Sequence, residues 1–342
     1  MAERLTEWIK SILLSTEGIT IGITILIAVL ASMHKGSYIL VNTIITGGMW
    51  ALMAIGIALL FGVMNVSNFA HGEYFMLGSL IAFFIYMPIC KYVISSPDSI
   101  LSYIGPLIAI MGGALGGVLS GGITERLIFK QLRMRNRQGW LLNCFLITTG
   151  LSVIMQNAHQ LFFGTNFKGI LAYWDFPSIS ILGVNVSIDR LATFVIAMLT
   201  MLAFYLFMMY STTGKSIRAV SQDEKGARMV GISVDSVHLI TFSLACGLAA
   251  LAGACLLFIF PSYPMAGVVP LYNSWFVIIL VGFGNVAGSV PGGFIIGLFQ
   301  VLTRTYLGEG WETVVPVLLI AAVLVVRPSG IFATKVRTIW DI

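Results

Sequence analysis

Charged residues are scarce in this sequence. They make up 10% of its 342 positions, whereas hydrophobic residues make up 58% and the mean hydropathy is +0.96. A soluble domain carries about 25% charged residues, so this composition excludes a protein that faces water on all sides. Membrane spans must be helices or strands of closed barrels, because backbone groups in lipid need partners within the protein. The apolar runs here are long and do not alternate, which predicts helices.

Cysteine and histidine are too few and too scattered for a metal site or a disulfide framework. The four cysteines form no CxxC pair and lie in or beside apolar runs, so we interpret them as small buried residues. The histidines form no ligand pair at helical spacing. We therefore expect neither a metal nor another cofactor. The positions concerned are Cys90, Cys144, Cys246, Cys255, His34, His71, His159 and His238.

A nucleotide-binding motif is also missing. TGKS at 213–216 resembles the end of a phosphate-binding loop, but Met209 stands where the pattern requires glycine, and an apolar run precedes it instead of a strand. Neither a serine nucleophile elbow nor HExxH is present. We expect that the chain is not an enzyme and that any ATP hydrolysis takes place on separate partner subunits.

Few ionisable residues interrupt the apolar runs. Ion-coupled transporters usually keep such residues inside the bundle as relays. The exceptions here are Glu73, close to His71, and a group near a predicted outer end, namely Arg304, Glu309 and Glu312. A chain that moves a polar solute with neither an ion relay nor a nucleotide site needs an external motor. An ion-coupled secondary transporter remains the alternative.

The apolar runs predict an all-α polytopic membrane protein with about ten transmembrane helices, some of them short or discontinuous. The two runs within 271–306 are short and flank GFGNVAGSVPGG, so they are either two short spans or a re-entrant pair. The runs fall at about 18–33, 38–63, 72–89, 100–123, 140–163, 190–210, 237–260, 271–284, 292–306 and 312–326.

Basic residues set the predicted orientation, because cytoplasmic connections are enriched in Lys and Arg. The connections 124–139 and 211–236 and the C-terminal tail are basic, whereas 164–189 and 261–270 are not. We expect cytoplasmic segments at 1–17 and 327–342, a transmembrane domain at 18–326, and a location in the plasma membrane. Lys130 and Lys225 would then face the cytoplasm and Asp175 the outside. Contact with the bilayer accounts for the basic tracts, so no nucleic-acid partner is expected.

The stretch NVSNFAHGE at 65–73 has the most unusual local chemistry. It sets several polar side chains and a glycine between two apolar runs, as broken helices beside a solute path do. The alternative is a tight turn in which Asn68 caps the next helix and Glu73 lies near its N-terminus. Both interpretations stay open. The candidate pathway residues are Asn65, Asn68, His71, Gly72 and Glu73.

The connection 211–236 is longer than a topology signal requires. It mixes both charge signs and is punctuated by Gly214, Gly226 and Gly231, which predicts a short helix from Gly214 to Gly231 on the cytoplasmic face. Ala227 and Gly231 would form a small-residue face that fits a groove of another protein.

Several stretches together resemble the permease subunits of branched-chain amino-acid ABC importers. They are FGVMNVSNFAHGEYFMLGSL at 61–80, ITERLIFKQLR at 123–133, LITTGLSVIMQN at 146–157, the whole of 211–253, VGFGNVAGSVPGG at 281–293 and RPSGIFA at 327–333. The resemblance covers about 40–333. It implies a second permease subunit, homologous or identical, two cytoplasmic ATP-binding subunits and an extracytoplasmic solute-binding protein.

The same resemblance implies that 211–236 is the coupling loop inserted into an ATPase groove, through Gly214, Arg218, Gln222, Asp223, Ala227 and Gly231. It implies transport of branched-chain amino acids or related small polar solutes, and urea and short-chain amide importers share this permease type. Trp275 and Phe276 stand where many relatives have smaller residues, which bears on the solute if they border its path.

Overall fold

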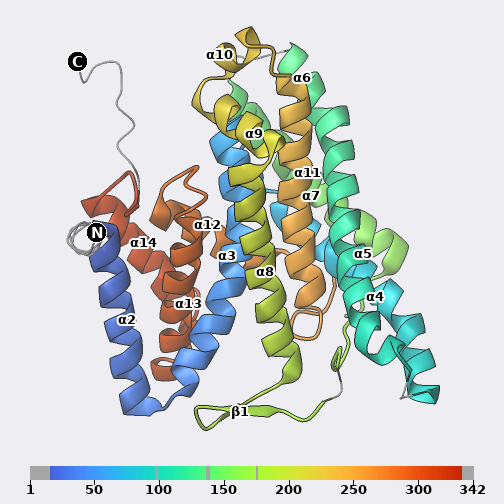
Figure 1. The fold of residues 1–342 in the computed structure, drawn as a ribbon, viewed down its shortest axis with the longest axis vertical. Coiled ribbons are helices and arrows are strands. Elements are labelled where there is room, and N and C mark those ends of the chain that lie inside the picture. The colour runs from blue at the N-terminus through green and yellow to red at the C-terminus, as the bar shows by residue number, and fades with distance from the viewer. Residues whose placement is uncertain (1–15, 97–98, 136–138, 175, 333–342) are drawn as a thin grey trace.

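The computed structural model describes residues 16–96, 99–135, 139–174 and 176–332. The expectations for residues 1–15, for Asp175 and for the tail from 333 onward therefore lie outside the described residues. Within them, a long or half-length helix matches each of the ten predicted apolar runs (Figure 1). These helices are α2 (Thr16–Lys35), α3 (Tyr38–Met64), α4 (His71–Ser95), α5 (Leu101–Thr124), α7 (Trp140–Phe163), α8 (Ile188–Tyr210), α11 (Val234–Cys255), α12 (Val268–Val281), α13 (Ser289–Tyr306) and α14 (Val314–Val326).

The all-α membrane architecture is confirmed. Among the described residues, eight helices are long and apolar enough to cross a membrane, while α12 has only 14 residues. The remaining elements are short: the π-helical turn η1 (Glu125–Phe129), α6 (Lys130–Arg135), α9 (Thr212–Gln222), α10 (Glu224–Met229), the 3₁₀ turn η2 (Glu309–Trp311), β1 (Ile179–Ile181) and β2 (Val184–Val186). The predicted number of ten spans is therefore approximate.

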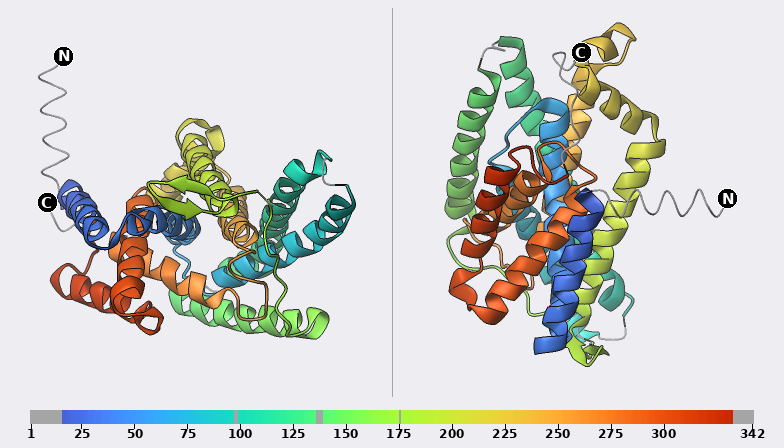
Figure 2. Two further views of the ribbon diagram at one scale, coloured as in Figure 1. Left: turned by 90° about the horizontal axis from the view of Figure 1, so that it is seen from below. Right: turned by 90° about the vertical axis from the view of Figure 1, so that its left-hand side faces the viewer.

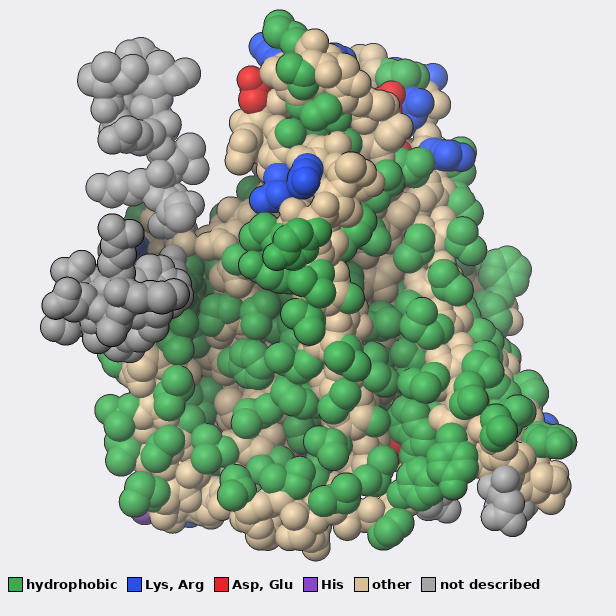
Figure 3. Space-filling model, viewed as in Figure 1, with side chains coloured by type: hydrophobic (Ala, Val, Ile, Leu, Met, Phe, Trp, Pro, Cys, Tyr) green, Lys and Arg blue, Asp and Glu red, His purple; other side chains and the backbone are tan. Residues whose placement is uncertain are grey.

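Helices α3 and α11 form the centre of the bundle. In each of them 83% of the most apolar stretch is buried, compared with 11% in α2, α7 and α14. Seen along the bundle, α7 and α8 lie on opposite sides (Figure 2). The outer helices carry apolar side chains on their exposed faces (Figure 3), which is the distribution that lipid requires.

Glycines bring α5 close to its neighbours. A Cβ at Gly113 would lie 2.7 Å from the carbonyl oxygen of Gly78 in α4, and one at Gly121 would lie 2.7 Å from the Cβ of Cys246 in α11. Only glycine allows backbones to approach this closely, as in helix pairs within membranes. The three helices therefore form one tightly packed unit.

The two ends of the bundle differ. At one end α9 and α10 form a cap, and Lys and Arg side chains gather there (Figure 3). At the other end β1 and β2 form an antiparallel hairpin in which Ser180 pairs with Asn185 (Figure 1). We call these the cap end and the hairpin end.

The chain after α14 returns to the turn between α12 and α13. The amide of Ile331 donates to the carbonyl of Leu280 at 2.8 Å, and that of Phe332 to the carbonyl of Val281 at 3.1 Å. Asn285 Nδ2 also donates to the carbonyl of Phe332 at 2.8 Å. The motifs GFGNVAGSVPGG and RPSGIFA, far apart in sequence, are thus one structural unit.

Candidate functional site

The segment 65–70 is an irregular link that returns into the bundle. Asn65 ends α3 in the left-handed conformation (φ 52°), and it is exposed. At the other end of the link, a Cβ on Gly56 of α3 would lie 2.9 Å from the His71 ring. Gly56 precedes the end of α3 by about 12 Å of helix rise. Helix α4 therefore begins beside the middle of α3, as a discontinuous helix would.

The start of α4 meets the start of α12. Gly72 and Gly267 are both buried, and a Cβ on either would collide with the other's carbonyl group. Two helix N-termini are thus in backbone contact inside the bundle. His71, Gly72 and Glu73 are brought together here, whereas Asn65 lies apart from them at the end of α3.

Asn68 does not cap α4, because the N-cap residue of that helix is Ala70 and no described side chain caps it. Asn68 instead holds the turn before the helix. Its Oδ1 accepts a hydrogen bond from the amide of Ala70 at 3.0 Å, and its side chain is fully buried. The link is also tied to α7, because the amide of Phe69 donates to Thr148 Oγ1 at 3.2 Å and this hydroxyl lies 3.2 Å from the carbonyl of Ser67. Asn68 therefore fixes the turn that leads into α4.

Glu73 reaches toward α7 and has polar partners there. Its Oε1 accepts hydrogen bonds from Ser152 Oγ at 2.9 Å and from Gln156 Nε2 at 2.7 Å. The residue is 1% exposed, and Oε2 has no partner among the described residues. Such groups are rare in membrane spans and mark functional positions by default. In the sequence, Ser152 and Gln156 stood out only as part of the motif at 146–157, and neither was assigned to the candidate pathway.

The face of α7 around this network is polar and open. Gln156, Asn157 and Gln160 line a cavity of about 310 Å³ together with Thr165 and the loop 263–265. On the other side of the link, Phe69 stacks on Trp275 with ring centroids 5.0 Å apart. Trp275, noted in the sequence as unusual, thus lies beside the candidate pathway segment.

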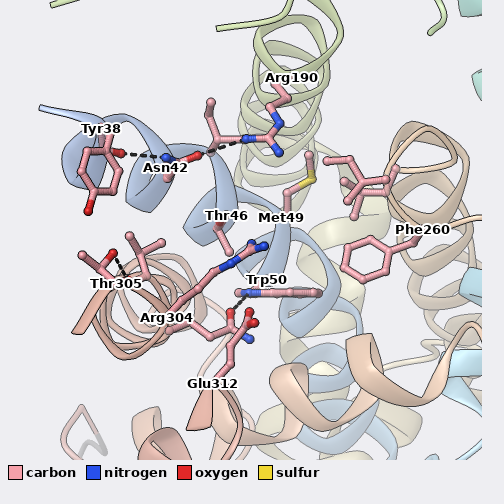
Figure 4. A pocket seen from close by; sticks show the side chains of 15 residues that line it. Tyr38, Asn42, Thr46, Met49, Trp50, Arg190, Phe260, Arg304, Thr305 and Glu312 are labelled. Atoms are coloured by element: carbon pink, nitrogen blue, oxygen red, sulfur yellow. Dashed lines mark hydrogen bonds between the residues drawn. The ribbon is translucent and has the colours of Figure 1, made fainter. Parts of the chain in front are cut away.

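A larger cavity of about 490 Å³ opens among α3, α8, α13 and the segments after α11 and before α14 (Figure 4). Trp50 Nε1 donates to Gln300 Oε1 at 2.6 Å, and Gln300 Nε2 donates to Asn273 Oδ1 at 3.2 Å. Sequence reasoning noted only Arg304 and Glu312 of its lining. The full lining is Tyr38, Asn42, Ile45, Thr46, Met49, Trp50, Arg190, Leu256, Ile259, Phe260, Gln300, Val301, Arg304, Thr305 and Glu312.

The connection 211–236 forms two helices, not the single helix predicted from Gly214 to Gly231. Ser211 Oγ accepts from the amide of Gly214 at 2.8 Å and caps α9. Asp223 adopts an extended conformation and its Oδ1 accepts from the amide of Lys225 at 2.9 Å, which ends α9 and starts α10. The break arises because an aspartate side chain competes for backbone amides.

The predicted small-residue face is also wrong. Ala227 is 5% exposed and packs against its own chain, and Gly231 has φ +87°, which L side chains rarely adopt. Any larger side chain at Gly231, such as tryptophan, would therefore strain the backbone regardless of the space around it. The large apolar residues exposed at this tip are Met229 (87%) and Val230 (77%). Arg218 instead reaches back toward the carbonyl of Met209 at 3.3 Å, while Gln222 is exposed.

Comparison with known proteins identifies the family. Residues 39–325 match the family described as branched-chain amino acid transport system / permease component. The permease protein LivH of Salmonella typhimurium is 28% identical over 295 residues, which cover 85% of this chain and 93% of that protein. BraD of Pseudomonas aeruginosa is 30% identical over 300 residues, covering 85% and 94%. Both are named high-affinity branched-chain amino acid transport system permease proteins. No solved structure matches the chain significantly. The chain belongs to the branched-chain amino acid transport system permease family.

Proposed function

We propose that the chain is the transmembrane permease subunit of an ATP-driven importer that carries branched-chain amino acids across the plasma membrane. This proposal rests on the family match over 39–325. The matched range contains, completely or nearly so, nine of the ten helices that correspond to the apolar runs, and only α2 lies outside it. Relatives named as permeases for these solutes are covered over 93–94% of their length. Hydrolysis of ATP would take place on two separate cytoplasmic subunits, since this sequence has no phosphate-binding loop.

The cap end would face the cytoplasm. Lys and Arg side chains gather at this end (Figure 3), as the positive-inside rule requires. Residues 18–326 would then be the permease domain, with cytoplasmic segments before and after it. A second permease subunit would complete the membrane part, and an extracytoplasmic solute-binding protein would dock at the hairpin end.

The tip of α10 would contact the ATPase. Met229 and Val230 are large apolar side chains exposed on the cap end, outside the apolar belt, where water would otherwise meet them. Caps at Ser211 and Asp223 hold α9 and α10 in fixed positions. A rigid contact can transmit the movement of an ATPase to α8 and α11, which flank the connection.

The path of the solute would border the start of α4, where Glu73, Gln156 and Ser152 interact. A buried carboxylate with a free oxygen, two helix N-termini in contact and a polar cavity on α7 support this position. Asn65, which is exposed at the end of α3, would not take part.

One experiment tests the function. The chain is tagged in its native host, and the complex that copurifies with it is reconstituted in vesicles with its binding protein. ATP-dependent accumulation of leucine, isoleucine and valine is expected, with none when ATP is replaced by a non-hydrolysable analogue. Uptake of urea or a short-chain amide instead of these solutes would overturn the substrate, and uptake driven by a proton gradient alone would support a secondary transporter.

The contact with the ATPase has its own test. The double change Met229→Asp and Val230→Asp should leave the chain folded in the membrane, reduce the amount of copurified ATPase and abolish uptake. Ser236→Asp, at an exposed position of the same end, is the matched control. Full ATPase recovery and uptake in the double variant would place the contact elsewhere, with 124–139 as the next candidate.

A further inference from the structure

The cavity among α3, α8 and α13 contains charges of both signs. Arg190 comes from the first turn of α8, Arg304 from the last turn of α13, and Glu312 from the segment before α14. Arg304 extends between Thr46 and Trp50, and Glu312 approaches from the opposite side of Trp50 in the same view (Figure 4). Three charged groups from separate elements therefore line one cavity.

The two guanidinium groups keep donors for a ligand. Arg190 Nη1 donates to Asn42 Oδ1 at 3.1 Å, which fixes the direction of the side chain. Arg304 forms an ion pair with Glu309 at the rim. A guanidinium group has five N–H donors in a planar fork that fits a carboxylate, so one partner does not saturate either arginine.

The floor of the cavity is apolar, buried and held in place. Trp50 is 4% exposed, and its indole N–H is occupied by Gln300, which in turn is held by Asn273. Phe260 lies with its ring centroid 6.3 Å from that of Trp50. Met49 is also buried beside them. This surface is formed before any ligand binds, and it can accept an aliphatic side chain without rearrangement.

We propose that this cavity is a binding site for a zwitterionic α-amino acid with an aliphatic side chain. The carboxylate would pair with Arg190 and Arg304, the ammonium group with Glu312, and the side chain would pack on Trp50 and Phe260. A volume of about 490 Å³ is ample for such a molecule. The inference rests on the proposed function and narrows its substrate, because urea or an amide would leave the charges of the site unmatched.

A zwitterionic lipid headgroup shares the same pair of charges. Its phosphate could meet the arginines and its ammonium group Glu312. The headgroup of phosphatidylethanolamine, however, has no aliphatic branch that could fill the floor formed by Trp50 and Phe260. We therefore assign the site to the free amino acid and make the lipid an outcome of the test.

The test measures binding of radiolabelled leucine to the purified complex, without the binding protein, in phosphatidylcholine nanodiscs. Arg190→Gln and Glu312→Gln should each weaken leucine binding about tenfold or more, because each removes a charge-assisted contact. Lys91→Gln removes an exposed charge near the same end of the bundle and should have no effect. Copurified ATPase and the elution profile confirm that each variant is assembled.

Leucine analogues sharpen the assignment. Leucinamide lacks the carboxylate, so wild type should prefer leucine over it, and Arg190→Gln should lose most of that preference. 4-Methylpentanoate is leucine without its ammonium group. Wild type should prefer leucine over this acid, and Glu312→Gln should lose most of that preference. A variant that is merely destabilised would weaken all three ligands equally.

Two results would overturn the inference. One is leucine binding that is equal in wild type and in both variants while ATP-driven leucine uptake continues, in which case the proposed function stands without this site. The other is loss of leucine binding to wild type when phosphatidylethanolamine replaces part of the phosphatidylcholine, provided that wild type retains this lipid and Arg190→Gln does not. Uptake of a neutral solute in place of leucine would instead refute the proposed function itself.

Discussion

The start of α4 and the cavity beside α8 are both polar regions in an apolar bundle, but their polar groups are used differently. At the start of α4 the backbones of Gly72 and Gly267 touch, and Asn68 and Glu73 bind partners within the protein. In the cavity Arg190 and Arg304 keep free donors around an open volume. Folding should therefore depend mainly on side-chain volume in the first region, whereas ligand binding in the second should depend mainly on charge.

The largest effect is expected for Gly72→Val. The added side chain would collide with the carbonyl of Gly267, which is backbone and cannot rotate away. We expect most of the folded protein to be lost, as measured by size-exclusion chromatography of a fluorescently tagged chain in detergent. Gly22→Val is the matched control, because a Cβ there meets nothing within 4 Å. Wild-type folded yield for Gly72→Val would show that the contact between the two helix starts is not tight.

Glu73→Gln tests whether this region also serves transport. Glutamine keeps the shape and an oxygen that can accept from Ser152 and Gln156, and removes only the charge. We expect a normal folded yield and a loss of uptake per assembled complex on the order of tenfold. Uptake unchanged after normalisation to the assembled complex would make Glu73 a structural residue and the start of α4 a purely packed region.

Asn68→Ala should lower the stability of the protein and leave uptake unchanged, which is the opposite of the result expected for Glu73→Gln. The change removes the acceptor of the Ala70 amide, and leaving a buried donor without its partner costs about 1–3 kcal/mol of stability. We expect a lower unfolding temperature with normal uptake per assembled complex. Ser95→Ala, which removes an exposed side-chain bond to the carbonyl of Tyr92, is the control. Impaired uptake at full stability would instead place Asn68 on the path of the solute.

The sequence was informative where residues that act together are consecutive. The apolar runs predicted the positions of the helices, eight of which are long enough to span a membrane among the described residues, because a spanning helix must be apolar along its length. The stretch 65–73 was noticed as unusual because its polar residues interrupt two such runs within a few positions. Its depth could not be predicted, since the return of the link into the bundle depends on the contact between Gly72 and Gly267.

The cavity could not be predicted because its residues come from separate helices. Trp50, Arg190 and Gln300 are single polar or amphipathic residues in different runs, and each alone resembles an interfacial or packing residue. Only the fold shows that Trp50 and Gln300, 250 positions apart, share a hydrogen bond. The break at Asp223 was missed for another reason. The prediction of one helix rested on the charges and glycines of the whole connection, whereas a single side chain decided the local outcome, because Asp223 Oδ1 accepts from the amide of Lys225.

The smallest effect is expected for Glu309→Gln. This variant tests whether Arg304 acts on a ligand or through its ion pair with Glu309. Glu309 pairs with Arg304 at the rim, where the two side chains are 74% and 58% exposed. Pairs this exposed contribute about 0–1 kcal/mol, because water and salt screen them. If Arg304 binds a ligand, Glu309→Gln should leave the unfolding temperature nearly unchanged and change the affinity for leucine by less than about threefold. Arg304→Gln, in contrast, should weaken leucine binding about tenfold. Equal losses in the two variants would mean that Arg304 matters through its pair with Glu309, and the rim of the cavity would then resemble the turn at Asn68, whose polar contact serves the protein alone.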